Sequence, residues 1–374
     1  MNKKVIVYRC KDVSKTSLAI KTIFENLGGI ENIIKKGQRV LIKPNLVAPF
    51  EFAVTSSEVI EAVVLQVQKV GAIPIVAESS GFEFDTSSAI KILEIDKLCK
   101  RLDVEFINLD KGEFVDVETN NFPIKTFKIS KLIFEVDAII NLPKLKGHAL
   151  TKVTLGMKNL FGVIHKDTRR KIHAYNLEKG IYALSQIVKP TITIIDGLFS
   201  QELAVFSKPY YLGIIAGSFD VPSIDVVCSQ IFGVDYKEVP HIQMGFENRN
   251  INEIDIQCFN CSVDEFKFTS PTPKNIKRQL KKFAYKLVYQ LDIIYNRITK
   301  KTMLSKVHLL FGIRPFIVES KCTLCGDCVP VCKVNAISII GGKCKIDYDQ
   351  CMYVRCLKCI EVCKYNAIIT KGLH

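Results

Sequence analysis

The sequence predicts two folded parts: a large α/β domain with a mostly parallel sheet and helices on both faces, and a small cysteine-rich α+β domain at the C-terminus. Short apolar runs alternate with amphipathic runs through the first part. Nine of the 14 cysteines crowd into residues 322–363, and a strongly basic stretch separates the two parts. We therefore expect three segments: an α/β body at 1–270, a basic amphipathic helical linker at 271–316 and the C-terminal domain at 317–374.

The alternation of strands and helices is the main argument for the α/β body. In the helix expected at residues 56–70, apolar side chains recur three and four positions apart, which is the spacing of one buried face. Strands are expected where short apolar runs occur, at residues 4–8, 39–43, 73–77, 138–142, 191–195 and 212–216. Strands that alternate with helices favour a mostly parallel sheet, in which ligands lie beyond the carboxyl ends of the strands.

Cationic side chains follow two of the expected strands. Lys43 ends the strand at 39–43, and Lys144, Lys146 and His148 follow the strand at 138–142. Neighbouring Pro and Gly residues restrict the backbone there, so these side chains are expected to form a site for a carboxylate, a phosphate or a similar anion. A proton is expected to come from His148 or from His165 further along.

Other features of the body set limits on this site. The sequence contains no G-x-x-x-x-G-K-[ST] loop and no G-x-G-x-x-G loop after a strand, so we do not expect an ATP or dinucleotide site. A helix carrying Lys152, Lys158 and Asn159 is expected after His148. The charged run at 165–173 is expected to be mainly a solvated loop.

The basic stretch at residues 274–306 carries ten Lys or Arg residues against one acid, Asp292. Its apolar side chains favour a helix that docks on one of the two folded parts. An anionic membrane surface or an acidic partner is the alternative, and nucleic acid is disfavoured because no groove-reading motif accompanies the charge. No run is long and apolar enough to span a membrane, and the N-terminus does not resemble a secretory signal, so we expect a cytoplasmic protein.

The cysteines of the C-terminal domain form a duplicated motif. The two copies read Cys322-x2-Cys325-x2-Cys328-x3-Cys332 and Cys351-x4-Cys356-x2-Cys359-x3-Cys363. Their ends, CVPVCKVNAI and CIEVCKYNAI, agree at seven of ten positions. This duplication is typical of bacterial ferredoxins that hold two [4Fe–4S] clusters, and it disfavours a zinc ribbon.

The spacing also assigns the ligands. Three cysteines on one short loop face one cluster, and the fourth, at the start of a helix, reaches the other cluster. The first set is Cys322, Cys325, Cys328 and Cys363, and the second set is Cys332, Cys351, Cys356 and Cys359. The gap between Cys351 and Cys356 is four residues instead of two, which leaves a labile second cluster or a [3Fe–4S] cluster as alternatives. Cys344 is the less favoured substitute ligand.

Longer motifs in the body resemble a known family. These are NLPKLKGHALTKVTLGMKNLFGVIH at 141–165, with KPNLV before it and GSFDVPSIDVV after it at 217–227. They are similar to domain-of-unknown-function family 362 over most of residues 1–270. The resemblance implies a cytoplasmic iron–sulfur protein, commonly from anaerobes, that often carries a C-terminal two-cluster ferredoxin domain and has no agreed reaction.

Three functions are consistent with these features. In the first, a ferredoxin-linked oxidoreductase exchanges electrons with a redox partner protein and binds an anionic substrate in its body. In the second, the protein is a non-catalytic electron carrier or adaptor. In the third, it is an iron–sulfur redox sensor.

Overall fold

The computed structural model describes residues 3–81, 86–120, 122–148, 150–202, 209–262, 265, 290, 291, 295, 314–351 and 358–371. The chain divides into two compact units, Met1–Ile298 and Thr299–His374, and each is described by itself. The linker predicted at 271–316 lies outside the described residues, apart from Gln290, Leu291, Tyr295 and residues 314–316. The basic stretch at 274–306 is therefore an expectation without a structural account.

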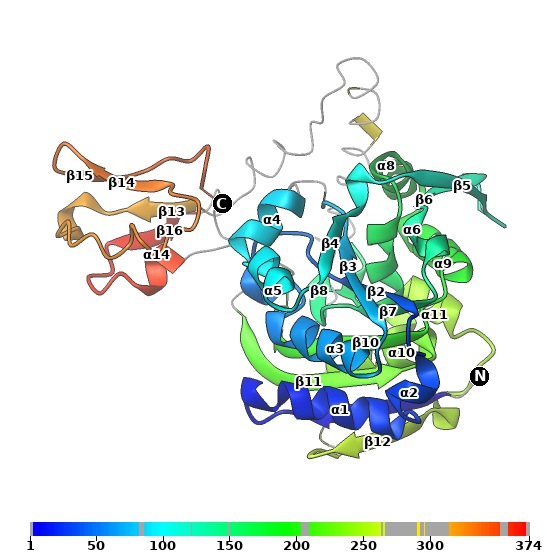
Figure 1. Ribbon diagram of the computed structural model, residues 1–374. Coiled ribbons are helices and arrows are strands. Elements are labelled where there is room, and N and C mark those ends of the chain that lie inside the picture. The colour runs from blue at the N-terminus through cyan, green and yellow to red at the C-terminus, as the bar shows by residue number, and fades with distance from the viewer. Residues whose placement is uncertain are drawn as a thin grey trace. The chain divides into compact units, whose positions relative to one another are not determined.

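An eight-stranded sheet forms the centre of the first unit (Figure 1). The strand order is β12-β1-β11-β10-β7-β2-β3-β4. The strands are β1 (Lys4–Arg9), β2 (Arg39–Pro44), β3 (Ile73–Glu78), β4 (Glu105–Asn108), β7 (Ala138–Leu142), β10 (Ile192–Ser200), β11 (Tyr210–Ser218) and β12 (Asp255–Phe259). Within this sheet only β11 runs antiparallel to its neighbours, β1 and β10. The predicted α/β fold with a mostly parallel sheet is confirmed.

Helices cover both faces of this sheet. They are α1 (Thr16–Asn26), α2 (Ile30–Ile33), α3 (Ser57–Lys69), α4 (Thr86–Ile92), α5 (Ile95–Arg101), α6 (Leu132–Glu135), α7 (Gly156–Asn159), α8 (Lys166–Tyr175), α9 (Leu177–Ile187), α10 (Val221–Ile231) and α11 (Pro240–Gly245). Side chains of α1, α3 and α5 pack in one core cluster, against one face. Side chains of α7, α8 and α9 pack in a second cluster, and those of α10 and α11 in a third, against the other face.

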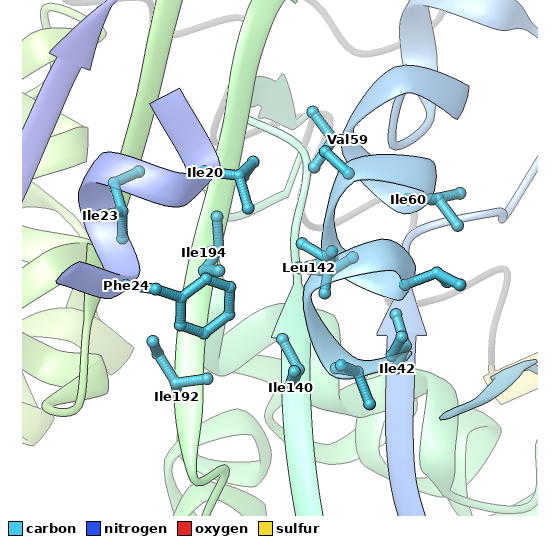
Figure 2. Close-up of a cluster of buried hydrophobic side chains, with 14 of the residues drawn as sticks. Ile20, Ile23, Phe24, Ile42, Val59, Ile60, Ile140, Leu142, Ile192 and Ile194 are labelled. Atoms are coloured by element: carbon cyan, nitrogen blue, oxygen red, sulfur yellow. The ribbon is translucent and has the colours of Figure 1, made fainter. Parts of the chain in front are cut away.

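Successive side chains along β2 enter different cores, because neighbouring residues of a strand point to opposite faces. Val40 and Ile42 lie in the cluster with α1 and α3, whereas Leu41 lies in the cluster with α7 to α9. Figure 2 shows Ile42 in this cluster together with Val59 and Ile60 of α3 and Ile140 of β7. A strand buried on both faces reads as a continuous apolar run, which is why these strands could be predicted from the sequence.

Two local predictions were wrong. Lys152 does not lie on a helix but on β9 (Lys152–Thr154), which forms a hairpin with β8 (Lys146–His148) before the single turn of α7. The charged run at 165–173 is not a loop but most of α8, and Arg169 and Arg170 are only 6% and 9% exposed. Arg169 is drawn inward by the carbonyl oxygen of Ser80, to which its guanidinium donates a hydrogen bond.

A separate antiparallel pair flanks the sheet in the first unit. It consists of β5 (Phe114–Glu118) and β6 (Thr126–Ser130), neither of which the sequence analysis predicted. Phe127 and Ile129 of β6 are fully buried in the core shared with α7 to α9. The pair therefore extends that core beyond the main sheet.

The C-terminal unit repeats one backbone pattern twice. It contains β13 (Arg314–Ile317), β14 (Ile337–Ile340), β15 (Lys343–Ile346), α14 (Lys358–Glu361) and β16 (Ile368–Lys371), with β13 paired to β16 and β14 to β15. In each half an asparagine in the left-handed region donates its N–H to a cysteine carbonyl: Asn335 to Cys332 at 2.8 Å and Asn366 to Cys363 at 3.1 Å. The sequence duplication is thus also a structural one.

Candidate functional site

Four predicted cluster cysteines line one cavity in the C-terminal unit. They are Cys322, Cys325, Cys328 and Cys363, the set that the spacing assigns to the first cluster. The loop between the first three turns through Leu324 and Gly326, whose φ angles are 58° and 84°. Ala367 donates its backbone N–H to Cys363 Sγ at 3.2 Å. Four free thiols around one cavity, with a backbone donor, fit a [4Fe–4S] cluster.

The second predicted ligand set is described only in part. Cys332, Cys351 and Cys359 belong to the described residues, whereas Cys356 lies outside them. Cys332 Sγ accepts the backbone N–H of Ala336 at 3.2 Å, which repeats the contact made by Cys363 in the other half. A second cluster therefore stays a prediction.

In the body, Lys43 and Lys144 are fully buried at the carboxyl ends of β2 and β7, and each has a carboxylate partner. Lys43 Nζ lies 2.8 Å from Glu78 Oε2, and Lys144 Nζ lies 2.8 Å from Asp196 Oδ2. Burial lowers the pKa of Lys43, and the charge of Glu78 opposes this shift. Because both ammonium groups are already paired, these lysines hold the ends of the strands together.

Lys146 differs from these two lysines. Its Nζ donates hydrogen bonds to Asn45 Oδ1 at 3.0 Å and to the carbonyl oxygen of Ala53. Burial, followed by the charges of Lys158 and Lys144, lowers the pKa of Lys146 to about 7. Among the described residues, no carboxylate lies within ion-pair distance of it. Its ammonium charge is therefore not neutralised by the described part of the chain.

Lys158, on α7, is the second lysine of this kind. Protein atoms surround its ammonium group although part of the side chain stays exposed, and burial lowers its pKa to about 8, opposed by the charge of Glu178. No ion pair of Lys158 is found in the described residues. A bound anion would offset the cost of burying either ammonium group.

A chain of three amide side chains holds Lys146 in position. Asn45 donates to Asn159 at 2.9 Å, Asn159 donates to Asn141 at 2.9 Å, and Asn141 donates to the carbonyl oxygen of Gly156 at 3.1 Å. Asn45 follows β2, Asn159 is the last residue of α7, and Asn141 lies on β7. The network therefore connects two strand ends to the helix that carries Lys158.

His148 lies on β8, partly buried, within electrostatic range of Lys158 and Lys146. Its Nδ1 accepts the backbone N–H groups of Leu150 and Thr151, both at 3.2 Å. Burial holds the pKa of His148 well below 6.5. The ring is therefore neutral at pH 7 with its proton on Nε2, so it is a hydrogen-bond donor there.

His165 lies apart from these groups. It caps the N-terminus of α8, where its Nδ1 accepts the N–H of Asp167, and its ring packs edge-on against Phe114 with 4.9 Å between centroids. Its pKa is lowered by burial, and the charged groups that affect it are Asp167, Lys166, Lys128 and Arg169. None of the predicted lysines is among them.

Three further residues complete the set around Lys158, and the sequence analysis did not predict them. His173 packs edge-on against Phe161, the ring that Lys158 Nζ also faces at 5.8 Å from its centroid. His241 Nδ1, fully buried on α11, is within hydrogen-bond distance of Glu178 Oε2 on α9. Helices α9 and α11 pack together, so only tertiary structure joins these residues. We call Lys146, His148, Lys158, His173, Glu178 and His241 the lysine–histidine cluster.

The lysine–histidine cluster has the chemistry of an anion site. It combines two lysines that have no described carboxylate partner with one neutral imidazole donor, His148, close to the carboxyl ends of parallel strands. Within the lysine–histidine cluster, no three of the described His and Glu side chains form a group that could hold a metal ion.

Two family models match the chain. "Domain of unknown function (DUF362)" matches residues 40–230, and "4Fe-4S binding domain" matches residues 315–338. The first span includes Lys43, Lys146 and Lys158, and the second includes the first cysteine motif. The predicted resemblance is confirmed.

The chain is also similar to a curated protein of Synechocystis sp. named "Thylakoid-associated protein sll1697". The two are 30% identical over 256 residues, which cover 64% of this chain and 78% of the relative. In the described part of this chain, no helix has the length and apolar character needed to cross a membrane.

A solved structure, the lactate racemase apoprotein from Thermoanaerobacterium thermosaccharolyticum, matches with a TM-score of 0.41 and 13% identity. The match covers 60% of this chain and 56% of that chain. A similarity of this extent carries no conclusion about the reaction.

Proposed function

We propose that this chain, which belongs to the DUF362 family, is a ferredoxin-linked oxidoreductase. Its 4Fe-4S binding domain makes it an iron–sulfur protein, and the proposal starts from this premise. The body binds a small anionic substrate at the lysine–histidine cluster. A [4Fe–4S] cluster, when bound in the C-terminal unit, supplies or accepts single electrons.

One observation carries the proposal for the body. Lys146 is 3% exposed, yet its ammonium group has no carboxylate partner among the described residues. Lys43 and Lys144, equally buried, each have such a partner. Burying a cation without an opposite charge nearby costs free energy, and a bound anion offsets that free energy.

The other residues have supporting parts in this proposal. Lys43 and Lys144 hold the strand ends through their ion pairs, and Asn45 orients Lys146. Lys146 and Lys158 bind the anion, and His148 donates a hydrogen bond to it through Nε2. His165, which lies apart from the lysines, is a second candidate proton donor without a described contact to them.

The substrate proposal is tested by anion binding. Wild type, Lys146→Met and Lys171→Met are titrated calorimetrically with small mono- and dicarboxylates and with inorganic phosphate. Lys171 is an exposed lysine of α8 and is the control. We expect Lys146→Met to weaken binding at least tenfold, about 1.4 kcal/mol, and Lys171→Met to bind like wild type.

Turnover then separates the enzyme from the carrier. The protein is reduced anaerobically, and an anion that binds is tested for its ability to reoxidise the protein, followed by absorbance. Loss of this reaction in Lys146→Met at unchanged iron content supports the oxidoreductase. Equal reaction or binding in Lys146→Met and wild type contradicts the substrate site and favours an electron carrier or adaptor.

For the cofactor content we propose two [4Fe–4S] clusters, the second held by Cys332, Cys351, Cys356 and Cys359. The duplicated backbone around Cys332 and Cys363 supports this number. About eight irons and eight sulfides per chain are expected after anaerobic purification. About four of each contradicts the second cluster, and zinc without sulfide contradicts both.

Two further proposals concern location and partners. We propose a cytoplasmic protein that exchanges electrons with a redox partner protein, and for the basic stretch at 274–306 we propose either an acidic partner or an anionic membrane surface. Vesicles containing anionic lipid, compared with neutral vesicles in a sedimentation assay, decide between these. Binding to the anionic vesicles alone, lost in a chain with residues 274–306 neutralised, favours the membrane surface.

A further inference from the structure

Cys344 is the one cysteine of residues 322–363 that neither predicted ligand set contains. It lies on β15, directly opposite Ile339 of β14. The hairpin turns at Gly341 and Gly342, whose φ angles are 62° and 71°. A two-residue hairpin turn requires such positive φ angles, and it fixes the register of the two strands. Because a shift by one residue would move Cys344 to the other face, this turn determines where its thiol points.

The thiol of Cys344 points to the first cluster set. Cys344 lines the same cavity as Cys322, Cys325, Cys328 and Cys363, and Ile339 lines it as well. Its Sγ lies 3.8 Å from Cys328 Sγ, so the two sulfurs are in contact. If Cys344 substitutes for a ligand, it does so in the first set and not, as the sequence alone suggested, in the second.

We propose that Cys344 is a reserve ligand of the first iron–sulfur site, able to replace Cys328. Each iron of a [4Fe–4S] cluster takes one protein thiolate, and two sulfurs in contact with each other can reach the same iron. When Cys344 binds, its thiol proton passes to Cys328 as the iron–Cys328 bond breaks and the iron–Cys344 bond forms. Charge and electron count are unchanged, so the exchange needs no oxidant or reductant.

This role differs from that of an ordinary buried thiol. A thiol that only fills space is replaced by alanine without consequence for iron retention. A reserve ligand instead recaptures an iron whose bond to Cys328 has broken, before the iron escapes. The two roles therefore differ in the iron content of variants and in the rate of iron loss.

The test compares Cys328→Ala with Cys325→Ala, the control, in the full-length chain. Cys325 lines the same cavity, but the described residues give it no second thiol at hydrogen-bond distance. After anaerobic reconstitution, iron and acid-labile sulfide are measured and an EPR spectrum is recorded on the reduced protein. We expect Cys328→Ala to keep the iron content of wild type, and Cys325→Ala and Cys328→Ala/Cys344→Ala to lose up to about four irons.

Equal iron loss in Cys328→Ala and Cys325→Ala overturns the proposal. A second measurement tests the proposal even if Cys328→Ala does not fold. Cys344→Ala, which keeps all eight predicted ligands, is compared with wild type during incubation with an iron chelator. We expect equal starting iron content and several-fold faster iron loss in Cys344→Ala, and equal rates overturn the proposal. Neither readout depends on turnover, so the result is independent of the proposed oxidoreductase activity.

Discussion

In the α/β body, Lys43 and Glu78 are both fully buried, and Lys43 Nζ lies 2.8 Å from Glu78 Oε2. The body that holds this ion pair has large apolar core clusters, to which the strands of the sheet contribute side chains. In the C-terminal unit, the buried apolar cluster consists of Cys328, Ile337, Cys359 and Ile368, and two of these four are predicted cluster ligands. The body has enough apolar core to fold around its charged groups. In the C-terminal unit, two predicted cluster ligands form half of this buried cluster.

The comparison indicates what each unit loses when its functional groups are removed. The body is expected to keep its fold, and the loss in its free energy of unfolding depends on how well the remaining buried charges are paired. A small domain whose core residues are metal ligands is expected to lose its fold with the metal.

The largest effect is expected from iron removal. A chelator under reducing, anaerobic conditions should abolish hydrogen-exchange protection in β13–β16 and leave β2 and β7 of the body protected. Binding of a structural metal contributes on the order of 10 kcal/mol to the folding of a small domain. Strands β13–β16 that stay protected without iron would contradict the contrast between the units.

The next largest effect concerns the buried ion pair of the body. Glu78→Gln leaves Lys43 buried without its carboxylate, and we expect the free energy of unfolding to fall by about 3–5 kcal/mol. Glu61→Gln, which breaks an exposed pair with Arg101, is the control and should have a much smaller effect. Urea denaturation followed by far-UV circular dichroism measures both, and similar losses in the two variants would refute the role of burial.

Close packing around the same ion pair gives a smaller effect. A Cβ at Gly162 would overlap the Glu78 carboxylate and the Lys43 ammonium group. Gly162→Ala should therefore destabilise the body by about 1–3 kcal/mol. The control is Gly112→Ala, where the nearest atom to an added Cβ is 3.6 Å away. If Gly162→Ala and Gly112→Ala denature at the same urea concentration, the prediction is wrong, because the ion pair then shifts to accommodate the added Cβ.

The smallest effect, counted for one pH unit, is the dependence of stability on pH caused by Lys146. Its pKa is about 7 in the folded protein and about 10.4 when unfolded, so between these pH values the unfolded chain holds a proton that the folded chain lacks. Stability should therefore rise with pH above 7, by at most about 1.4 kcal/mol per unit from this group. Lys158 acts in the same direction from its pKa of about 8.

Denaturation of wild type, Lys146→Met and Lys171→Met at several pH values above 7 isolates this contribution. We expect the free energy of unfolding to rise less steeply with pH in Lys146→Met than in wild type, and as steeply as in wild type in Lys171→Met. An unchanged slope in Lys146→Met would mean that its ammonium group stays charged in the folded body, as it does in an exposed lysine.

The parts of the molecule that the sequence predicted are those set by local pattern. Strands buried on both faces are continuous apolar runs, so β2, β3 and β7 were predicted to within one residue of their observed bounds, whereas β10 runs to Ser200, past its predicted end at 195. The cavity lined by Cys322, Cys325, Cys328 and Cys363 agrees with the first predicted set, in which three cysteines share one loop and Cys363 comes from the second copy of the motif. An error occurred where a charged run folded as a helix with one buried face, since Arg169 on that face is held by a carbonyl 89 residues away.

By itself, the sequence determined the fold class and the placement of Lys43, Lys144 and Lys146 at strand ends, and it predicted the cysteine ligand sets, because spacing along the chain carries that information. Only the tertiary structure decided which of these lysines has a carboxylate partner, since Glu78 and Asp196 lie 35 and 52 residues from Lys43 and Lys144. The same holds for Glu178 and His241, and for the contact of Cys344 with Cys328. Partner choice depends on distances across the fold, which no local pattern encodes.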